Sequence, residues 1–180
     1  WLIKTDSTGT ADWKVNYGGE LYDSGWDVEQ TGDGNYIVLG TTRSYGTGGT
    51  TDAWLLKVRE SHVYHVATTG SDSTGDGSEG YPFATIQTAI DSSSDGDTVL
   101  VAAGIYEGGI VISNKAISLI GESREGTKIN QPISSPQISI VDCQAGTTRV
   151  ENFIIKHGSS NNGGGIYSSG STVEIDSVDF

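Results

Sequence analysis

Two acidic residues, Glu151 and Asp176, have the type and spacing that hydrolysis of a glycosidic bond needs. They lie 25 residues apart, and the same offset aligns Val150–Ile155 with Ile175–Phe180. If these segments are neighbouring parallel strands, their backbones lie about 4.8 Å apart. The two carboxyl groups then come within the roughly 5–9.5 Å that glycosidic cleavage requires. Lys156 follows closely in sequence and is the candidate basic group.

A solvated surface explains the same acidic residues without catalysis. The chain carries 23 acidic and 10 basic residues, for a net charge of −13. Outward positions of any stack of strands are polar, so acids align on such a surface without a chemical role. We therefore predict no catalytic residue here and keep Glu151, Asp176 and Lys156 as weak candidates.

The other reactive side chains do not form a recognisable constellation. His62 and His65 have no Ser and Asp partners spaced as in a catalytic triad. Cys143 is the only cysteine, so we expect a small core residue rather than a nucleophile. The loops Asp6–Gly9 and Asp33–Gly34 lack the alternating oxygen ligands and distal Glu of a calcium loop, and we interpret both as turns. No cofactor or metal is predicted, and calcium is left open without a supporting motif.

The charge and the apolar runs limit the partners. A net charge of −13 repels nucleic acids and anionic lipids, so neither is an expected partner. The longest apolar runs, such as Ile37–Leu39, are far too short to insert into a membrane. A polysaccharide or cell-surface glycan remains compatible with this surface. Few cysteines and many acids favour an extracellular or cell-surface location, and the sequence leaves the oligomeric state open.

The elements that position these residues are predicted to be short strands. The chain has 26 glycines, and Gly, Ser, Asn and Asp favour tight turns. In residues 1–58, Trp1–Lys4 recurs as Trp54–Lys57, a period of 53. Four antiparallel strands per period is typical of one propeller blade. The other strands expected in this part are 11–17, 26–30 and 36–41, the last two joined by the turn at Asp33–Gly34.

Three tryptophans of this segment have two interpretations. Trp13, Trp26 and Trp54 could form a platform on which sugar rings stack. Large aromatic residues are more often buried, so we favour core positions between neighbouring blades.

After a junction at 59–62, residues 63–180 are predicted to form a second domain. Phe83, Ile86, Ala89 and Ile90 follow helical spacing, which predicts one short helix near 83–91. Leu119 precedes Val150 by 31 residues at the same place in the pattern. Val141–Cys143 also aligns with Ile166–Ser168 at an offset of 25. The main strands are expected near 63–67, 98–102, 117–120, 149–155 and 173–178, with parallel neighbours among them.

Two stretches resemble known families. WLIKTDSTG, YGG and QTGDGNYIVLG, within residues 1–58, resemble a tandem repeat of bacterial and archaeal surface proteins whose repeats are thought to form β-propellers. Residues 65–108 resemble the entry segment of pectin-lyase-like right-handed parallel β-helices, in which a short helix caps the first coil. Residues 161–167 resemble the Gly-Gly-x-Ile repeats of bacterial surface β-helix proteins.

The resemblances imply an all-β chain: one antiparallel propeller-like blade at 1–58, then the N-terminal coils of a parallel β-helix at 63–180. Both ends fall inside strand-like runs, so we expect a fragment with further blades upstream and coils downstream. The first functional expectation is a non-catalytic extracellular or cell-surface repeat protein for adhesion or carbohydrate binding. The alternatives are the N-terminal part of a secreted polysaccharide lyase or glycoside hydrolase, whose catalytic coils lie downstream, and a structural surface spacer.

Overall fold

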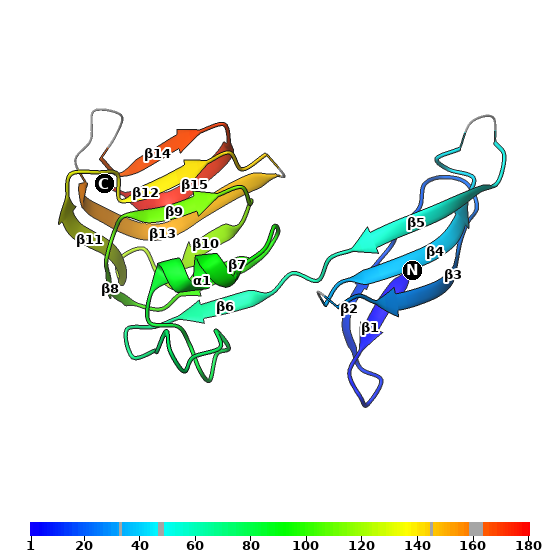
Figure 1. Ribbon diagram of the computed structural model, residues 1–180, viewed down its shortest axis with the longest axis horizontal. Helices are drawn as coiled ribbons and strands as arrows, with labels where there is room; N and C mark the ends of the chain where they lie inside the picture. The colour runs from blue at the N-terminus through cyan, green and yellow to red at the C-terminus, as the bar shows by residue number, and fades with distance from the viewer. Residues whose placement is uncertain (33, 47–48, 145, 159–163) are drawn as a thin grey trace. The chain divides into compact units, whose positions relative to one another are not determined.

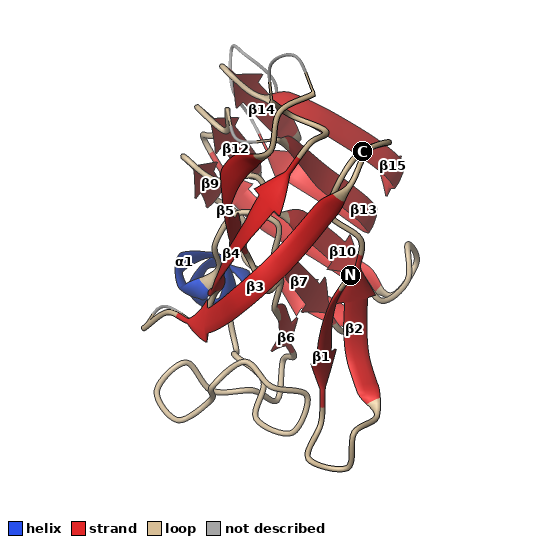
Figure 2. Ribbon diagram, turned by 90° about the vertical axis from the view of Figure 1, so that its right-hand side faces the viewer, coloured by secondary structure: helices blue, strands red, loops and turns tan. Residues whose placement is uncertain are grey.

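The computed structural model describes residues 1–32, 34–46, 49–144, 146–158 and 164–180. The chain divides into two compact units, Trp1–Glu60 and Ser61–Phe180. Strands dominate both, and the described residues contain one short α-helix, so the predicted all-β class is confirmed (Figure 2). Asp33 of the expected hairpin turn and residues 161–163 of the glycine-rich segment lie outside the described residues.

The first unit contains two antiparallel sheets. Strands β1 (Leu2–Thr5) and β2 (Ala11–Val15) form a hairpin. Strands β3 (Asp23–Gln30), β4 (Tyr36–Thr42) and β5 (Asp52–Val58) form a three-stranded sheet (Figure 1).

The predicted single four-stranded blade is therefore wrong, because β2 and β3 belong to different sheets. The connection between them contains Gly18, whose φ of 136° is rarely open to other residues. The backbone N–H of Gly19 then donates to the Asp23 carboxylate over 3.0 Å. The chain leaves the hairpin there instead of continuing the same sheet.

The second unit is a stack of parallel strands in which sequence neighbours rarely pair. One sheet runs β6–β7–β10–β13–β15, with β11 and β8 continuing from β13, and another runs β9–β12–β14; every pairing is parallel. Figure 1 shows β9, β12 and β14 side by side. The strands are β6 (Val63–Val66), β7 (Thr98–Val101), β8 (Gly104–Tyr106), β9 (Ile110–Ser113), β10 (Ser118–Gly121), β11 (Thr127–Ile133), β12 (Ile138–Val141), β13 (Thr147–Gly158), β14 (Ile166–Ser169) and β15 (Thr172–Asp179).

A bend at Asn152 lets β13 pair with different strands on two faces of the stack. Asn152 has a φ of 61°, and Ser177 opposite it on β15 has a φ of 52°. Such left-handed conformations are uncommon outside Gly, with Asn among the exceptions. Before the bend β13 pairs with β10, and after it with β11. The predicted turn-formers at these two positions thus mark a corner inside a long strand.

The register agrees with most of the predicted repeat. Val150 pairs with Ile175 and Glu151 with Asp176, at the offset of 25, and Leu119 pairs with Val150 at the offset of 31. The parallel pairing predicted between these strands is present.

The alignment of Val141–Cys143 with Ile166–Ser168 is wrong. Val141 pairs with Ser169 and Ile138 with Ile166, an offset of 28. The connection from β14 to β15 spans residues 170–171, whereas that from β12 to β13 spans 142–146. The connection after β14 is three residues shorter than the one after β12. Paired residues are therefore 28 positions apart between β12 and β14 but 25 apart between β13 and β15.

Columns of apolar side chains fill the space between the sheets. Val99, Leu119 and Val150 lie in register on successive strands and are each 0% exposed. Other columns on neighbouring strands are Tyr106–Ile129–Ile155 and Ile112–Ile140. Burying each such aliphatic side chain contributes roughly 1.5–3 kcal/mol, so in-register stacking is the main source of stability in this unit.

Helix α1 (Ile86–Ser92) covers one edge of the stack. Thr85 caps its first turn, and Ile86, Ala89 and Ile90 face the core, as the helical spacing predicts. The Gln87 side-chain amide accepts from Val111 N–H over 2.9 Å and donates to Val111 C=O over 3.1 Å. It thereby replaces the missing strand partner of β9.

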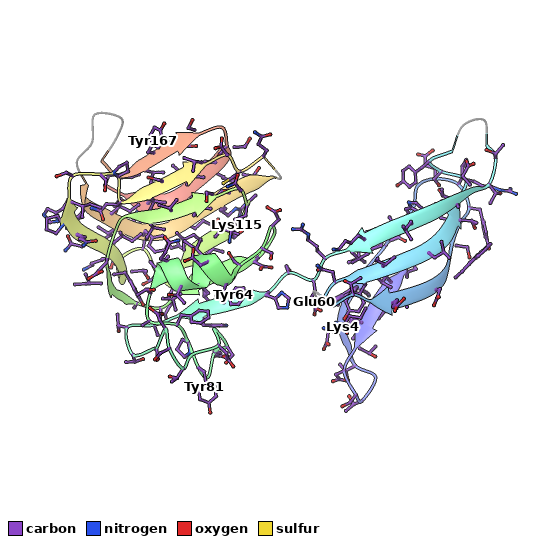
Figure 3. All side chains as sticks on the ribbon, in the orientation of Figure 1. Lys4, Glu60, Tyr64, Tyr81, Lys115 and Tyr167 are labelled. Atoms are coloured by element: carbon purple, nitrogen blue, oxygen red, sulfur yellow. The ribbon has the colours of Figure 1, made fainter. Side chains whose placement is uncertain are left out.

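Lys115 and the segment before the helix complete this cover. The Lys115 ammonium donates to the carbonyls of Ile90 and Ser93, each over 2.8 Å, at the C-terminal end of α1 (Figure 3). His65 of β6 donates its N–H to Gly77 and accepts from Phe83 N–H. Both open strand edges at this end are thus satisfied, which prevents further pairing there.

We expect Gly121→Ala to destabilise the second unit. A Cβ at this position would collide with the carbonyl oxygen of Asn152 on the next strand. Overpacking of this kind typically costs about 1–3 kcal/mol. Gly80→Ala is the matched control, because a Cβ there meets nothing within 4 Å. Chemical denaturation should show a lower midpoint for Gly121→Ala alone; equal midpoints would contradict the close stacking at this corner.

Candidate functional site

Glu151 and Asp176 are direct cross-strand neighbours, as the sequence predicts. The basic group that contacts Glu151 is Arg149, two residues before it on the same face. Its guanidinium donates to Glu151 over 3.0 Å and to Glu174 over 2.8 Å. The pKa of Arg149 is raised, chiefly by the hydrogen bond to Glu174 and by its charge. Arg149, Glu151 and Glu174 thus form a surface ion-pair group, and Asp176 lies beside Glu151 on the neighbouring strand.

Lys156 does not share the strand segment that carries these acids. It lies beyond the Asn152 bend, where its backbone pairs with Asn130 of β11. Sequence reasoning chose it by proximity in the chain and missed Arg149. The offset of 25 could have identified Arg149, because it places Glu174 beside Arg149 on the neighbouring strand.

The other predicted candidates, Cys143 and His62, contact groups of the surrounding fold. Cys143 is 1% exposed, and its thiol lies 3.4 Å from the carbonyl oxygen of Val141. The side chain of Asp97, 2% exposed, accepts from His62 N–H over 2.8 Å and from Ser94 N–H over 2.7 Å. This carboxylate closes the turn before β7, and Nδ1 of the His62 ring lies 3.9 Å from it.

The turn at Asp6 is closed by hydrogen bonds within the chain. The Asp6 carboxylate accepts from the Thr8 hydroxyl and from the N–H groups of Thr8 and Thr10. These bonds lower its pKa, the Thr8 hydroxyl most. Among the described residues, no three or more His, Cys, Asp or Glu side chains gather in a way that could hold a metal ion.

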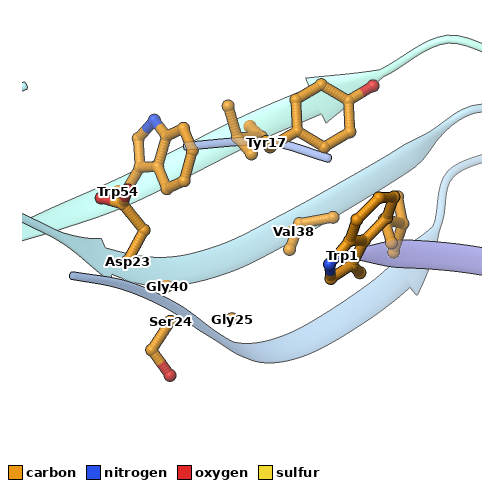
Figure 4. A pocket seen from close by; sticks show the side chains of 10 residues that line it. Trp1, Tyr17, Asp23, Ser24, Gly25, Val38, Gly40 and Trp54 are labelled. Atoms are coloured by element: carbon orange, nitrogen blue, oxygen red, sulfur yellow. The ribbon is translucent and has the colours of Figure 1, made fainter. Parts of the chain in front are cut away.

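A hollow in the first unit has a bare backbone floor and aromatic walls. Gly25, Gly40 and Trp54 lie side by side on β3, β4 and β5. The two glycines leave the sheet surface open beside the Trp54 ring, and Trp1 and Tyr17 complete the walls (Figure 4). The hollow has a volume of about 70 Å³, enough for part of one ring rather than a large ligand.

Asp23 lies at the same hollow and is firmly held. Its carboxylate accepts from Ser44 Oγ over 2.6 Å, from Thr42 Oγ1 over 2.5 Å and from Gly19 N–H over 3.0 Å. The hydrogen bonds from Ser44 and then Thr42 lower the pKa of Asp23 to about 2. The hollow therefore carries a fixed negative charge throughout the neutral and mildly acidic range.

The three tryptophans singled out by the sequence have different surroundings. Trp13 is half-buried and meets Tyr36 edge to face, with ring centroids 5.9 Å apart. Trp54 is half-buried, with its ring centroid 5.5 Å from that of Tyr45. Trp26 is 69% exposed in this unit, and its expected place between neighbouring blades stays a prediction. It lies in the β-bulge between Gly25 and Asp27, outside the regular pairing.

Two larger hollows occur in the second unit. One, of about 360 Å³, lies beside the start of α1 and is lined by residues including Thr85, Gln87 and Ile105. The other, of about 290 Å³, adjoins His65, Leu100 and Glu122. Glu151 and Asp176 line neither of them.

Comparison with protein-family models, with curated proteins and with solved structures finds no match to this chain. Within the part of the chain that is described, no helix has the length and apolar character needed to cross a membrane.

The lowered pKa of Asp23 gives a direct test of the first unit. We expect its carboxyl group, followed by NMR, to titrate near pH 2. Ser44→Ala should raise this pKa, because it removes the donor with the largest effect. Since the folded pKa lies below the unfolded value of about 3.9, the stabilisation is present above that value and is lost as the pH falls toward 2. An unchanged pKa in Ser44→Ala would contradict the hydrogen-bonded arrangement.

Proposed function

We propose that this chain is a non-catalytic module of an extracellular or cell-surface repeat protein that binds carbohydrate. In this proposal Ser61–Phe180 forms the first coils of a right-handed parallel β-helix. In Trp1–Glu60, β1 and β5 carry the repeated pattern and are equivalent strands of successive repeats.

The observation that carries the proposal is a repeating outer surface on stacked parallel strands. One outward row is Val63, Thr98, Ser118, Arg149 and Glu174, and the next is His65, Leu100, Ile120, Glu151 and Asp176. Each step along a row is one strand spacing, about 4.8 Å. A regular surface with half-buried apolar residues at one end and ion pairs at the other suits a repeating polymer such as a polysaccharide.

The ion pairs of Arg149 favour binding over catalysis. A glycosidase needs one carboxyl group as an acid and another as a base or nucleophile. Arg149 instead contacts Glu151 and Glu174 together, which suits a charged, solvated surface. Groups held this way can still accept hydrogen bonds from sugar hydroxyls.

One observation favours a second candidate, the start of a polysaccharide lyase or glycoside hydrolase. Glu151 and Asp176 are adjacent across parallel strands, which is the arrangement that paired carboxyl chemistry requires. A structural spacer is the third candidate, and it differs from the first by having no ligand.

We predict no turnover when the full chain is incubated with pectin, polygalacturonate or alginate in the presence of calcium. The expected reason is that Glu151 is ion-paired with Arg149, which leaves the two acids without a matched acid and base. Release of unsaturated products or reducing ends would be followed over time. Activity that disappears in Glu151→Gln or Asp176→Asn but persists in Glu125→Gln, a control on another exposed acid, would establish the enzyme alternative.

A glycan array with the full chain separates binding from a spacer role. Saturable binding to a defined glycan supports the proposed function. The absence of binding to every glycan at high protein concentration would favour the spacer.

A further inference from the structure

We propose that the hollow formed by Trp1, Tyr17, Gly25, Gly40 and Trp54 binds part of one neutral pyranose ring of a polysaccharide. This inference deepens the proposed carbohydrate binding and rests on it. It adds a site in the first unit to the outer surface of the second unit and states which sugars enter.

The floor of the hollow is open because the backbone requires it. Gly40 is buried, and a Cβ there would collide with the carbonyl oxygen of Ser24 on the neighbouring strand. The residue beside it, Gly25, is under no such constraint: its Cβ would lie 3.8 Å from Val38, an ordinary contact. The second glycine therefore does not serve the packing, and it widens the space in front of Trp54.

The walls offer flat aromatic surfaces of the kind that sugar rings stack on. Trp54 is held against Tyr45, so its ring is fixed before a ligand arrives. Trp1 is 78% exposed, although an aromatic ring of this size gains much from burial. A ligand stacked between these walls would cover apolar surface that the unit leaves in water.

Asp23 determines the charge of the preferred sugar. Donors from Ser44, Thr42 and Gly19 hold its carboxylate in place at the hollow. Its negative charge is fixed by these donors and repels the carboxylate of a uronic acid. Neutral hexose polymers are therefore favoured over polygalacturonate or alginate.

Two substitutions in the full chain test this assignment. Trp1→Ala removes an exposed wall, and Gly25→Leu fills the hollow from its floor at a position that tolerates a side chain. Both should weaken binding to the preferred neutral glycan about tenfold. The apparent Kd would be measured by titration with a soluble oligosaccharide identified on the array.

Each variant has a matched control. Trp26→Ala removes a tryptophan that is 69% exposed and lies outside the hollow. Gly32→Leu adds the same side chain where a Cβ meets nothing within 4 Å. Both controls should bind within about twofold of the parent chain. The unfolding midpoint of every variant shows whether the fold is retained.

The outcomes distinguish this inference from the function on which it rests. Weakened binding in Trp1→Ala and Gly25→Leu, with both controls unaffected, supports the hollow. Glycan binding that neither variant changes overturns the hollow but leaves carbohydrate binding in place. Stronger binding to polyuronates than to neutral glycans also overturns it. If the parent chain binds no glycan, the proposed function itself is wrong.

Discussion

The second unit depends on apolar side chains lying in register on successive parallel strands. Val99, Leu119 and Val150 are fully buried because each contacts the equivalent residue of the next strand. On the edge strand β15, Ile175 occupies the same column and is 47% exposed. The difference shows that neighbouring strands, rather than residue type alone, produce the burial. The same register fixes the outward rows, so stability and the proposed binding surface share one cause.

The first unit follows a different rule, because its sheets are antiparallel and keep much apolar surface exposed. Trp1, Trp26, Leu55 and Tyr22 are each more than half exposed. Burial contributes less here, and hydrogen bonds to one carboxylate, Asp23, join β3 to the end of β4 and the turn after it. Two glycines of the same strands, Gly25 and Gly40, leave the floor of the aromatic hollow open. The proposed ligand site of the first unit therefore depends on the local backbone at these glycines.

The sequence predicted the features that depend on local pattern. The helix, the strands around Val99, Leu119, Val150 and Ile175, and the pairing of Glu151 with Asp176 followed from spacing. It failed where corners change length, as at Val141, since loop length is independent of the apolar pattern. The sequence analysis also named Lys156 instead of Arg149 as the basic group. It considered residues close to Glu151 along the chain and not the pairs that the offset of 25 brings together. The hollow was missed because Gly25, Gly40 and Trp54 become neighbours only through strand pairing.

The parallel register of the second unit is the central claim, and nuclear Overhauser contacts in isotopically labelled protein measure it directly. We predict backbone contacts between Leu119 and Val150, between Val150 and Ile175, and between Val141 and Ser169. These correspond to offsets of 31, 25 and 28 residues. Contacts that run in the opposite sense, joining Thr147 to Asp179 and Ile154 to Thr172, would show antiparallel pairing and contradict the account.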